Sequence, residues 1–442
     1  MSVKVGLVSL GCSKNLVDSE MMLHKLRKKG YELVTEPGLS DVALVNTCGF
    51  IQSAKEEAIE TFVELIKLKN EGRIKKIIAT GCLAERYREE LKKEFPEIDA
   101  VVGLGEQPDI AEILDSVLGD EEIVRFSSKD RLEITGDRII STLPFFAYLK
   151  IAEGCSNNCT YCAIPKIRGA FRSAPMEDII KQAEYFADNG VTELIVIAQD
   201  TTRYGEDIYG QPKLPELLDK LCGIEKIRWI RVLYCYPERI TDELIDVIAK
   251  QDKIVKYMDI PIQHCNDEIL RRMNRKSRHK DLVDLMKKLR ERIPDITIRT
   301  TLITGFPGET EEQFEELAEF VKEMRFDRLG CFAYSQEEGT AAAEFDDQID
   351  DEIKQRRMDN IMESQQLISE QLCTAYQDKV VEAVVEGFDK YAECFFGRTQ
   401  ADAPDIDGKV FFSSETPLSV GQYVKVKITE TLDYDLIGEV AE

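Results

Sequence analysis

The chain has 442 residues, of which 43% are hydrophobic and 32% are charged. This composition supports a sizeable folded core and excludes extended disorder, collagen and coiled coil, and the length predicts about three domains. There are 58 Lys and Arg against 83 Asp and Glu, which gives a net charge of −25. Such a surface repels nucleic-acid phosphates and anionic lipid and attracts basic partners, so nucleic acid is disfavoured.

Cysteine use points to a reducing compartment. Twelve cysteines are too dilute for a small disulfide scaffold, and clustered cysteines in a reducing compartment suggest metal binding. Apolar runs such as residues 194–198 are far shorter than the about 20 residues of a membrane span. Residues 3–9 resemble a first β-strand more than the apolar part of a signal peptide. We therefore expect a cytoplasmic protein with no membrane contact.

Residues 1–119 alternate between strand and helix patterns, which predicts a small doubly wound α/β domain with a parallel sheet. Strands are expected at residues 3–9, 42–46, 76–80 and 100–102, and a helix at 17–28. The pattern Ser53-x-x-Glu56 predicts a capping box that opens another helix. Its buried face is expected to carry Ile59, Phe62, Val63 and Ile66.

Residues 120–143 are charged and weakly periodic, so we expect a connector, with a strand or hairpin near 131–140. The alternation then resumes over residues 141–372 and predicts a partial (β/α)6 barrel, because six units fall short of the eight of a full barrel. Strands are expected at residues 147–152, 193–198, 227–233, 257–260, 297–303 and 328–333. One helix is expected from Pro175 to Gly190, and Thr310-x-x-Gln313 predicts a second capping box.

A long polar helix is expected at residues 351–376, and a third domain at 375–442. Strict alternation of apolar and polar residues at 423–429 predicts a strand of a small antiparallel β-barrel. The other strands are expected at residues 380–385, 392–396, 410–412 and 436–440. From residue 376 onward there are six Lys and Arg against fourteen Asp and Glu. RNA-binding barrels need a positive surface, so this one is better suited to a cationic protein.

Three cysteines follow the first barrel strand in a C-x3-C-x2-C pattern, at Cys155, Cys159 and Cys162. Three thiolates so close on a loop can hold three corners of an iron–sulfur cube and leave one iron without a protein ligand. Structural zinc is the alternative, and it needs four closed ligands, with His264 or Cys265 as the fourth. The position at the C-terminal end of a barrel strand, where such barrels carry chemistry, favours the cluster.

Three more cysteines, Cys12, Cys48 and Cys82, each lie just past an expected parallel strand and beside a glycine. The C-terminal ends of strands in one doubly wound sheet converge on a common crevice, so these thiols can meet in space. Burial as core thiols is the alternative for each one alone. Because all three share the same placement, metal binding is favoured.

The C-x3-C-x2-C motif with Tyr161 before its last cysteine, on a six-unit partial barrel, resembles the radical S-adenosylmethionine (SAM) superfamily. This resemblance implies that Cys155, Cys159 and Cys162 hold a [4Fe-4S] cluster that binds SAM and forms a 5′-deoxyadenosyl radical. The domain order over the whole chain resembles the methylthiotransferases. In that family Cys12, Cys48 and Cys82 would hold a second [4Fe-4S] cluster, and the terminal barrel would be a TRAM domain. One SAM would supply the methyl group and another the radical.

Two methylthiotransferase subfamilies differ in substrate: one modifies an adenosine of tRNA, the other the β-carbon of an aspartate in small-subunit ribosomal protein twelve. Ribosomal proteins are basic, so the acidic chain favours the second. The segments 11–20, 233–237, 259–264 and 397–405 also resemble the second subfamily, apart from Cys235, where a threonine is usual. The tRNA enzyme is the alternative, and a zinc-stabilised RNA-binding module without catalysis is another. We further expect an electron donor as partner and a monomeric enzyme.

Other residues carry weaker signals. Gln199 ends the second barrel strand and is expected to contact SAM, although Gln199 to Thr202 can equally form a turn or cap. Gly305 follows the fifth strand and is expected near the nucleoside, although a Gly-Pro-Gly turn is weak evidence. His264 is as well explained by the core as by the substrate. The cluster Arg271, Arg272, Arg275, Lys276 and Arg278 is expected on a solvated face. The remaining cysteines are expected to be packing residues: Cys222, Cys235, Cys265, Cys331, Cys373 and Cys394.

Overall fold

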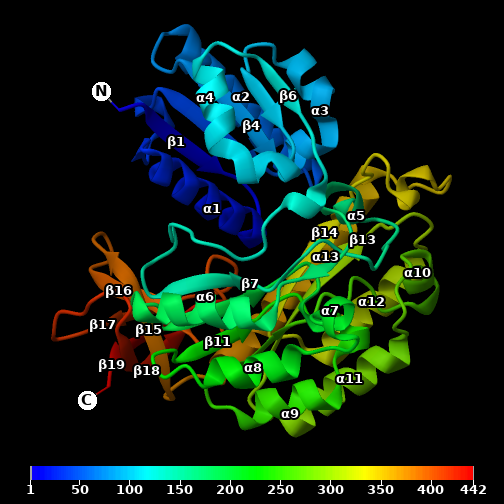
Figure 1. The fold of residues 1–442 in the computed structure, drawn as a ribbon. Coiled ribbons are helices and arrows are strands. Elements are labelled where there is room, and N and C mark those ends of the chain that lie inside the picture. Colours follow the sequence, from blue (N-terminus) through cyan, green and yellow to red (C-terminus); the bar gives the residue numbers. More distant parts are fainter. Residues whose placement is uncertain (1, 442) are drawn as a thin grey trace.

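The computed structural model describes residues 2–441 and contains three large sheets, arranged along the chain as in Figure 1, and one two-stranded sheet. The first sheet is wholly parallel, with strand order β2-β1-β3-β4-β5-β6. Its strands are β1 (Lys4–Ser9), β2 (Glu32–Val34), β3 (Val42–Thr47), β4 (Lys76–Gly81), β5 (Ala100–Val102) and β6 (Ile123–Arg125). Its helices are α1 (Ser13–Lys29), α2 (Gln52–Asn70), α3 (Cys82–Glu94) and α4 (Ile110–Leu118). This is the expected doubly wound domain.

The second sheet is an open, parallel partial barrel with strand order β14-β13-β12-β11-β10-β7. Its strands are β7 (Phe146–Lys150), β10 (Glu193–Ile197), β11 (Trp229–Val232), β12 (Ile254–Asp259), β13 (Thr297–Thr304) and β14 (Arg328–Ala333). A short antiparallel pair, β8 (Ala152–Glu153) and β9 (Arg172–Ser173), lies beside the start of the barrel. The predicted six βα units are therefore confirmed.

The barrel helices connect successive strands, and several of them cover the outer face of the sheet in Figure 1. The connecting helices are α5 (Ile164–Arg168), α6 (Met176–Asp188), α7 (Glu206–Tyr209), α8 (Leu214–Cys222), α9 (Asp242–Lys250), α10 (Asp267–Arg272), α11 (His279–Arg292) and α12 (Glu311–Met324), and α13 (Asp351–Thr374) follows the last barrel strand. At the start of α12, Thr310 and Gln313 form the predicted capping box. The long helix α13 packs on the edge strand β14 and leads to the third domain.

The third domain is a closed five-stranded barrel. Its strands are β15 (Val380–Asp389), β16 (Cys394–Thr399), β17 (Val410–Ser413), β18 (Tyr423–Thr431) and β19 (Leu436–Val440). The prediction of an entirely antiparallel barrel is wrong in one respect. Strands β17 and β19 pair in parallel, and this pair helps to close the barrel. Local alternation predicts strands but carries no information on which non-neighbouring strands pair.

Three local predictions in the first 140 residues are wrong in whole or in part. In α2 the side chains of Ile59 and Val63 are 42% and 56% exposed, contrary to the prediction. Phe62 is buried as predicted, and the rest of the buried face is formed by Ala58 and Leu65. The helix begins at Gln52, so Ser53 lies inside its first turn and does not cap it. No hairpin forms at 131–140 in the described chain; the connector instead supplies β6, which pairs with β5 and extends the first sheet.

One apolar cluster is shared by all three domains. Val17 and Met21 of α1 contact a barrel group that includes Trp229, and Val384 and Ala403 of the third domain complete the cluster. The Trp229 ring meets the Tyr423 ring of β18 edge to face at 4.8 Å. The three domains are therefore joined through a common core.

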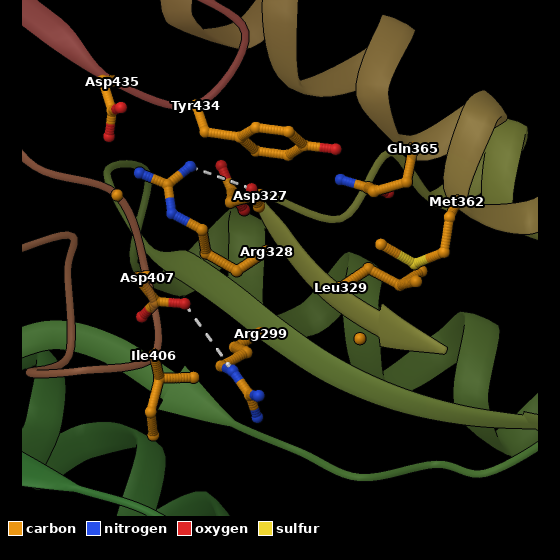
Figure 2. Close-up of a pocket in the computed structure, with 12 residues that line it drawn as sticks. Arg299, Asp327, Arg328, Leu329, Met362, Gln365, Ile406, Asp407, Tyr434 and Asp435 are labelled. Carbon is orange, nitrogen blue, oxygen red and sulfur yellow. Dashed lines mark hydrogen bonds and ion pairs between the residues drawn. The ribbon is translucent and has the colours of Figure 1, made fainter. Parts of the chain in front are cut away.

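A cavity of about 330 Å³ lies where the barrel, α13 and the third domain meet (Figure 2). Arg328 is the first residue of β14, so the cavity lies at the end of the sheet opposite to the C-terminal strand ends. Both of its arginines are already paired: Arg299 with Asp259 and Asp407, and Arg328 with Asp402. We therefore assign this cavity to the domain junction.

Candidate functional site

The loop that carries Cys155, Cys159 and Cys162 connects β8 to α5 at the C-terminal end of the first barrel strands. All three cysteines are partly exposed. The loop is anchored from two directions: the Cys155 amide donates to the Gly169 carbonyl at 3.1 Å, and the Thr160 amide donates to the Met273 carbonyl at 3.1 Å. Three thiols are thus presented from one short, fixed loop.

Burial dominates the acidity of two of these thiols, Cys155 and Cys162. It raises the pKa of Cys155 to about 11, and it raises the pKa of Cys162 further. The Cys159 sulfur lies 2.9 Å from the Tyr236 hydroxyl, and the Arg275 guanidinium stacks on the Tyr236 ring at 3.7 Å. Thiolates must form before a metal binds, so loading of this loop releases protons.

A second group of thiols forms where β1, β3 and β4 end. A Cβ atom on Gly11 would lie 2.6 Å from Cβ and 2.7 Å from Sγ of Cys48, so the loops that carry Cys12 and Cys48 touch there. Cys82 follows Gly81 at the start of α3 and interacts electrostatically with both other cysteines. The structure therefore brings Cys12, Cys48 and Cys82 together at one edge of the sheet.

These three thiols lie in different electrostatic surroundings. Loss of hydration by nearby protein atoms acts to raise the pKa of Cys12, but Lys14, Arg168 and nearby backbone amides outweigh it, so the pKa is lowered. Burial raises the pKa of Cys82 to about 12 despite the Arg168 charge. Arg168 is a residue of the barrel domain, and its positive charge acts on cysteines of the first domain.

Arg168 is part of a buried network of ion pairs that joins the two cysteine groups. Its guanidinium donates to Glu153 at 3.0 Å, to Asn15 at 3.0 Å and to Asp18 at 2.9 Å. Lys150 bonds the same two carboxylates, at 2.6 Å to Asp18 and 3.0 Å to Glu153. The four charged side chains are at most 1% exposed and their charges balance. One end of the network is on α1, the helix that directly follows Cys12, and the other end is Glu153, two residues before Cys155.

Gln199 lies beside this network. Its Nε2 donates to Glu153 Oε1 at 2.8 Å, and its Oε1 is buried with no hydrogen-bond partner. A buried amide oxygen without a hydrogen-bond partner lowers the stability of the fold. Such an oxygen is typical of a residue that hydrogen-bonds to a polar group of a ligand. Contact with SAM stays a prediction for Gln199.

Gly305 has a packing explanation. Its φ is +68°, and a Cβ atom there would lie 2.3 Å from the Cγ atom of Lys354 on α13. Its amide donates to Glu309 Oε2 at 3.0 Å, and the same carboxylate oxygen lies 3.4 Å from Nε2 of the fully buried His264. His264 is thus a core residue whose Nδ1 accepts a hydrogen bond from the Asn266 amide at 2.9 Å, while its Nε2 has no hydrogen-bond partner. A contact of Gly305 with the nucleoside stays a prediction.

The sequence did not predict the role of some residues at the site. Arg275, assigned to a solvated face, is 3% exposed and stacks on Tyr236 beside the cysteine loop. Lys150, Glu153 and Arg168 were not singled out, although a lysine in the otherwise apolar segment Phe146–Ile151 is a signal for a buried ion pair.

Three family models match the chain in succession. They are Uncharacterized protein family UPF0004 over residues 4–103, the Radical SAM superfamily over residues 149–321, and the TRAM domain over residues 379–441. Proteins named ribosomal protein uS12 methylthiotransferase RimO match over their whole length. The Lachnoclostridium phytofermentans protein is 50% identical over 437 residues (99% of each chain), and the Clostridioides difficile protein is 50% identical over 442 residues (99% of each chain).

The chain belongs to the RimO family of radical SAM methylthiotransferases. Membership implies iron–sulfur chemistry and the use of SAM. The fold is also similar to that of a radical SAM methyltransferase, TsrM, from Kitasatospora setae, with a TM-score of 0.56 at 12% identity over 75% of this chain and 73% of that chain. Within residues 2–441, no helix has both the length and the apolar character that a membrane crossing requires.

Proposed function

We propose that this chain inserts a methylthio group at the β-carbon of an aspartate in ribosomal protein uS12. The observation that carries the proposal is the pair of cysteine groups, one in each of two domains, joined by the buried Arg168 network. Relatives that are 50% identical over 99% of their length are named ribosomal protein uS12 methylthiotransferase, which supports the proposal. Residues 1–119, 141–372 and 375–442 are the corresponding domains of the proposal.

The donor atoms suit two [4Fe-4S] clusters. Three cysteines in each group can bind three irons of a cluster and leave the fourth open to another ligand. When bound, the clusters and SAM supply the sulfur, the methyl group and the radical that abstracts hydrogen. The unpaired Oε1 of Gln199 next to Glu153 supports a polar contact with SAM.

The chain itself holds the two cysteine groups at a fixed separation and keeps water out between them. Lys150 and Arg168 tie Glu153, next to the loop of Cys155, to Asp18 of the first domain. Fixed geometry of this kind removes entropy from the reacting step. Because these groups are at most 1% exposed, their electrostatic interactions are stronger than they would be in water.

Charge supports a protein substrate. The net charge of the chain is −25, and from residue 376 onward acidic side chains outnumber basic ones by fourteen to six. Such a surface attracts a basic ribosomal protein and repels tRNA. Further elements of the proposal are an electron donor as partner, a monomeric state and a cytoplasmic location.

Iron content after anaerobic reconstitution tests the two-cluster assignment. We expect about eight irons per chain in the wild type and about four in each of two triple variants, Cys12/48/82→Ala and Cys155/159/162→Ala. Only the second variant should lose reductive cleavage of SAM. Cys222→Ser, on α8, serves as the control and should keep eight irons. Four irons in the fully reconstituted wild type would refute the second cluster.

The substrate is tested by incubating reconstituted enzyme, SAM and a reductant with uS12 and, separately, with tRNA. We expect mass spectrometry to detect a methylthio group on the uS12 peptide that contains the target aspartate. A methylthio group on a tRNA nucleoside with none on the peptide would establish the tRNA reaction instead. Modification of neither substrate, by enzyme that cleaves SAM, would also contradict the proposal.

A further inference from the structure

Three potential metal ligands converge on the outer side of the barrel, from three separate segments. Cys265 follows β12, His279 is the first residue of α11, and Glu316 lies on α12. One ligand atom from each residue, a sulfur, an imidazole nitrogen and a carboxylate oxygen, lies within 4.8 Å of the other two. No second group of this kind occurs among residues 2–441.

Hydrogen bonding leaves the histidine atom free. Nδ1 of His279 is buried and has no hydrogen-bond partner, although Oε1 of Glu316 is only 3.2 Å away. A nitrogen and an oxygen bound to one tetrahedral zinc at about 2.0–2.1 Å are about 3.3 Å apart, which matches this spacing. Cys265 is fully buried and supplies the sulfur.

Neighbouring side chains hold the three residues in this arrangement. Nδ2 of Asn266 donates to Oε2 of Glu316 at 2.6 Å, which leaves Oε1 directed at His279. The His279 amide donates to Asp267 at 2.7 Å, and its ring contacts Phe320 edge to face at 5.3 Å. Such outer contacts are typical of metal sites, where they orient the ligands.

We propose that Cys265, His279 and Glu316 bind one Zn²⁺, with water as the fourth ligand. A thiolate, a carboxylate and a neutral imidazole balance the two charges of the ion. The site would also brace the cysteine loop of the barrel. Helix α10 starts two residues after Cys265, and the carbonyls of Arg272 and Met273 at its other end accept hydrogen bonds from Thr160, between Cys159 and Cys162.

Zinc analysis of the reconstituted holoenzyme tests the proposal, because filled clusters occupy the other cysteine groups. After exposure to ZnCl₂ and removal of unbound metal, we expect about one zinc per chain, with iron unchanged. Zinc-edge X-ray absorption should show one sulfur at about 2.3 Å and lighter ligands at about 2.0–2.1 Å. Cys265→Ser and the more conservative His279→Asn should reduce bound zinc at least tenfold while the iron content stays at the wild-type level.

Cys222→Ser provides the matched control, since this partly buried cysteine belongs to no ligand group and should keep its zinc. Less than a tenth of a zinc per wild-type chain would overturn the proposal. Equal zinc in wild type and His279→Asn, or a coordination shell made only of sulfur, would overturn it as well, because the metal would then occupy a cluster site. Iron content tests the two-cluster assignment and zinc content tests the zinc site, so either assignment can be refuted without the other.

Discussion

At the scale of single residues, the approach of the first three cysteines depends on backbone positions that exclude a side chain. Gly81 has φ +94° and ψ −164°, a region that is essentially restricted to glycine. A Cβ atom there would lie 2.4 Å from the Asn46 side chain and 2.5 Å from the Thr47 backbone. The end of β4 therefore fits against β3 only because residue 81 has no side chain.

We predict that Gly81→Ala lowers the free energy of unfolding of the metal-free protein by about 2–5 kcal/mol, from left-handed strain and overpacking together. Urea denaturation measures this loss. Because Cys82 follows directly, iron bound after reconstitution should fall toward four per chain.

Gly72→Ala is the matched control for this prediction. Gly72 also has a positive φ, of +74°, but nothing lies within 4 Å of its added Cβ. We expect Gly72→Ala to lower the free energy of unfolding by about 1 kcal/mol, from strain alone. Its iron content after reconstitution should equal that of the wild type. Equal losses of unfolding free energy in the two variants would show that the contact between residue 81 and β3 does not contribute to the destabilisation.

At the scale of elements, the five-residue helix α5 connects two cysteine groups that lie in different domains. It follows Cys162 closely, and its last residue, Arg168, reaches Asp18 on α1. A cluster bound by Cys12, Cys48 and Cys82 would be negatively charged, and Arg168 is the cation that acts on all three cysteines. The helix thus places a barrel charge beside the first domain.

We predict that Arg168→Gln makes the cluster of the first domain harder to reduce, because loss of a positive charge destabilises the reduced, more negative state. The measurement is a redox titration followed by electron paramagnetic resonance, in the Cys155/159/162→Ala background. Arg168→Lys should restore most of the midpoint potential.

Arg272→Gln is the control for the redox titration, since Arg272, at the end of α10, forms a partly exposed ion pair with Asp347. Its midpoint potential should equal that of the parent. A shift for Arg272→Gln as large as that for Arg168→Gln, or no shift for Arg168→Gln, would contradict a specific role for Arg168.

Elements differ in how far their sequence predicts them. The strand and helix order, the six barrel units and the gathering of each cysteine group follow from local periodicity and from the rule that parallel strands end at one edge. The Arg168–Asp18 pair could not be predicted, because its partners are 150 residues apart and any of many charges could pair with either. The buried face of α2 was predicted only in part, because apolar residues lie on two adjacent stripes of the helix. Only packing selects Ala58 and Leu65, beside the predicted Phe62, over Ile59 and Val63.

At the scale of the whole molecule, the third domain is attached to the barrel through a buried carboxylate. Glu193 at the start of β10 is bound by Arg231 of β11 and by Arg398 of β16, the latter at 2.7 Å. Burial acts to raise the pKa of Glu193, but the two arginines outweigh it and the pKa is lowered. The carboxylate therefore stabilises the folded chain fully above its unfolded pKa of 4.5, and this contribution is lost as the pH falls through the lower folded value.

We predict that protection of β16 from hydrogen exchange is constant from pH 7 to about pH 5 and falls only below pH 4.5. Glu193→Gln should reduce it already at pH 7, because removing one partner of a buried pair costs about 3–5 kcal/mol. The control is Glu382→Gln, which breaks an exposed pair with Arg228 across the same junction and should cost about 0–1 kcal/mol. Equal effects of the two variants would argue against the buried pair as the main attachment.

The apolar cluster shared by the three domains has an optical consequence. Trp229, the single tryptophan of the chain, lies in this cluster and is 1% exposed. Its ring touches Tyr423 of the third domain, and the same cluster includes Val17 and Met21 of the first. Entry of water on separation of either outer domain would shift its emission to longer wavelength. In the metal-free protein, the fluorescence of one native side chain is thus a reporter of domain docking that needs no added label.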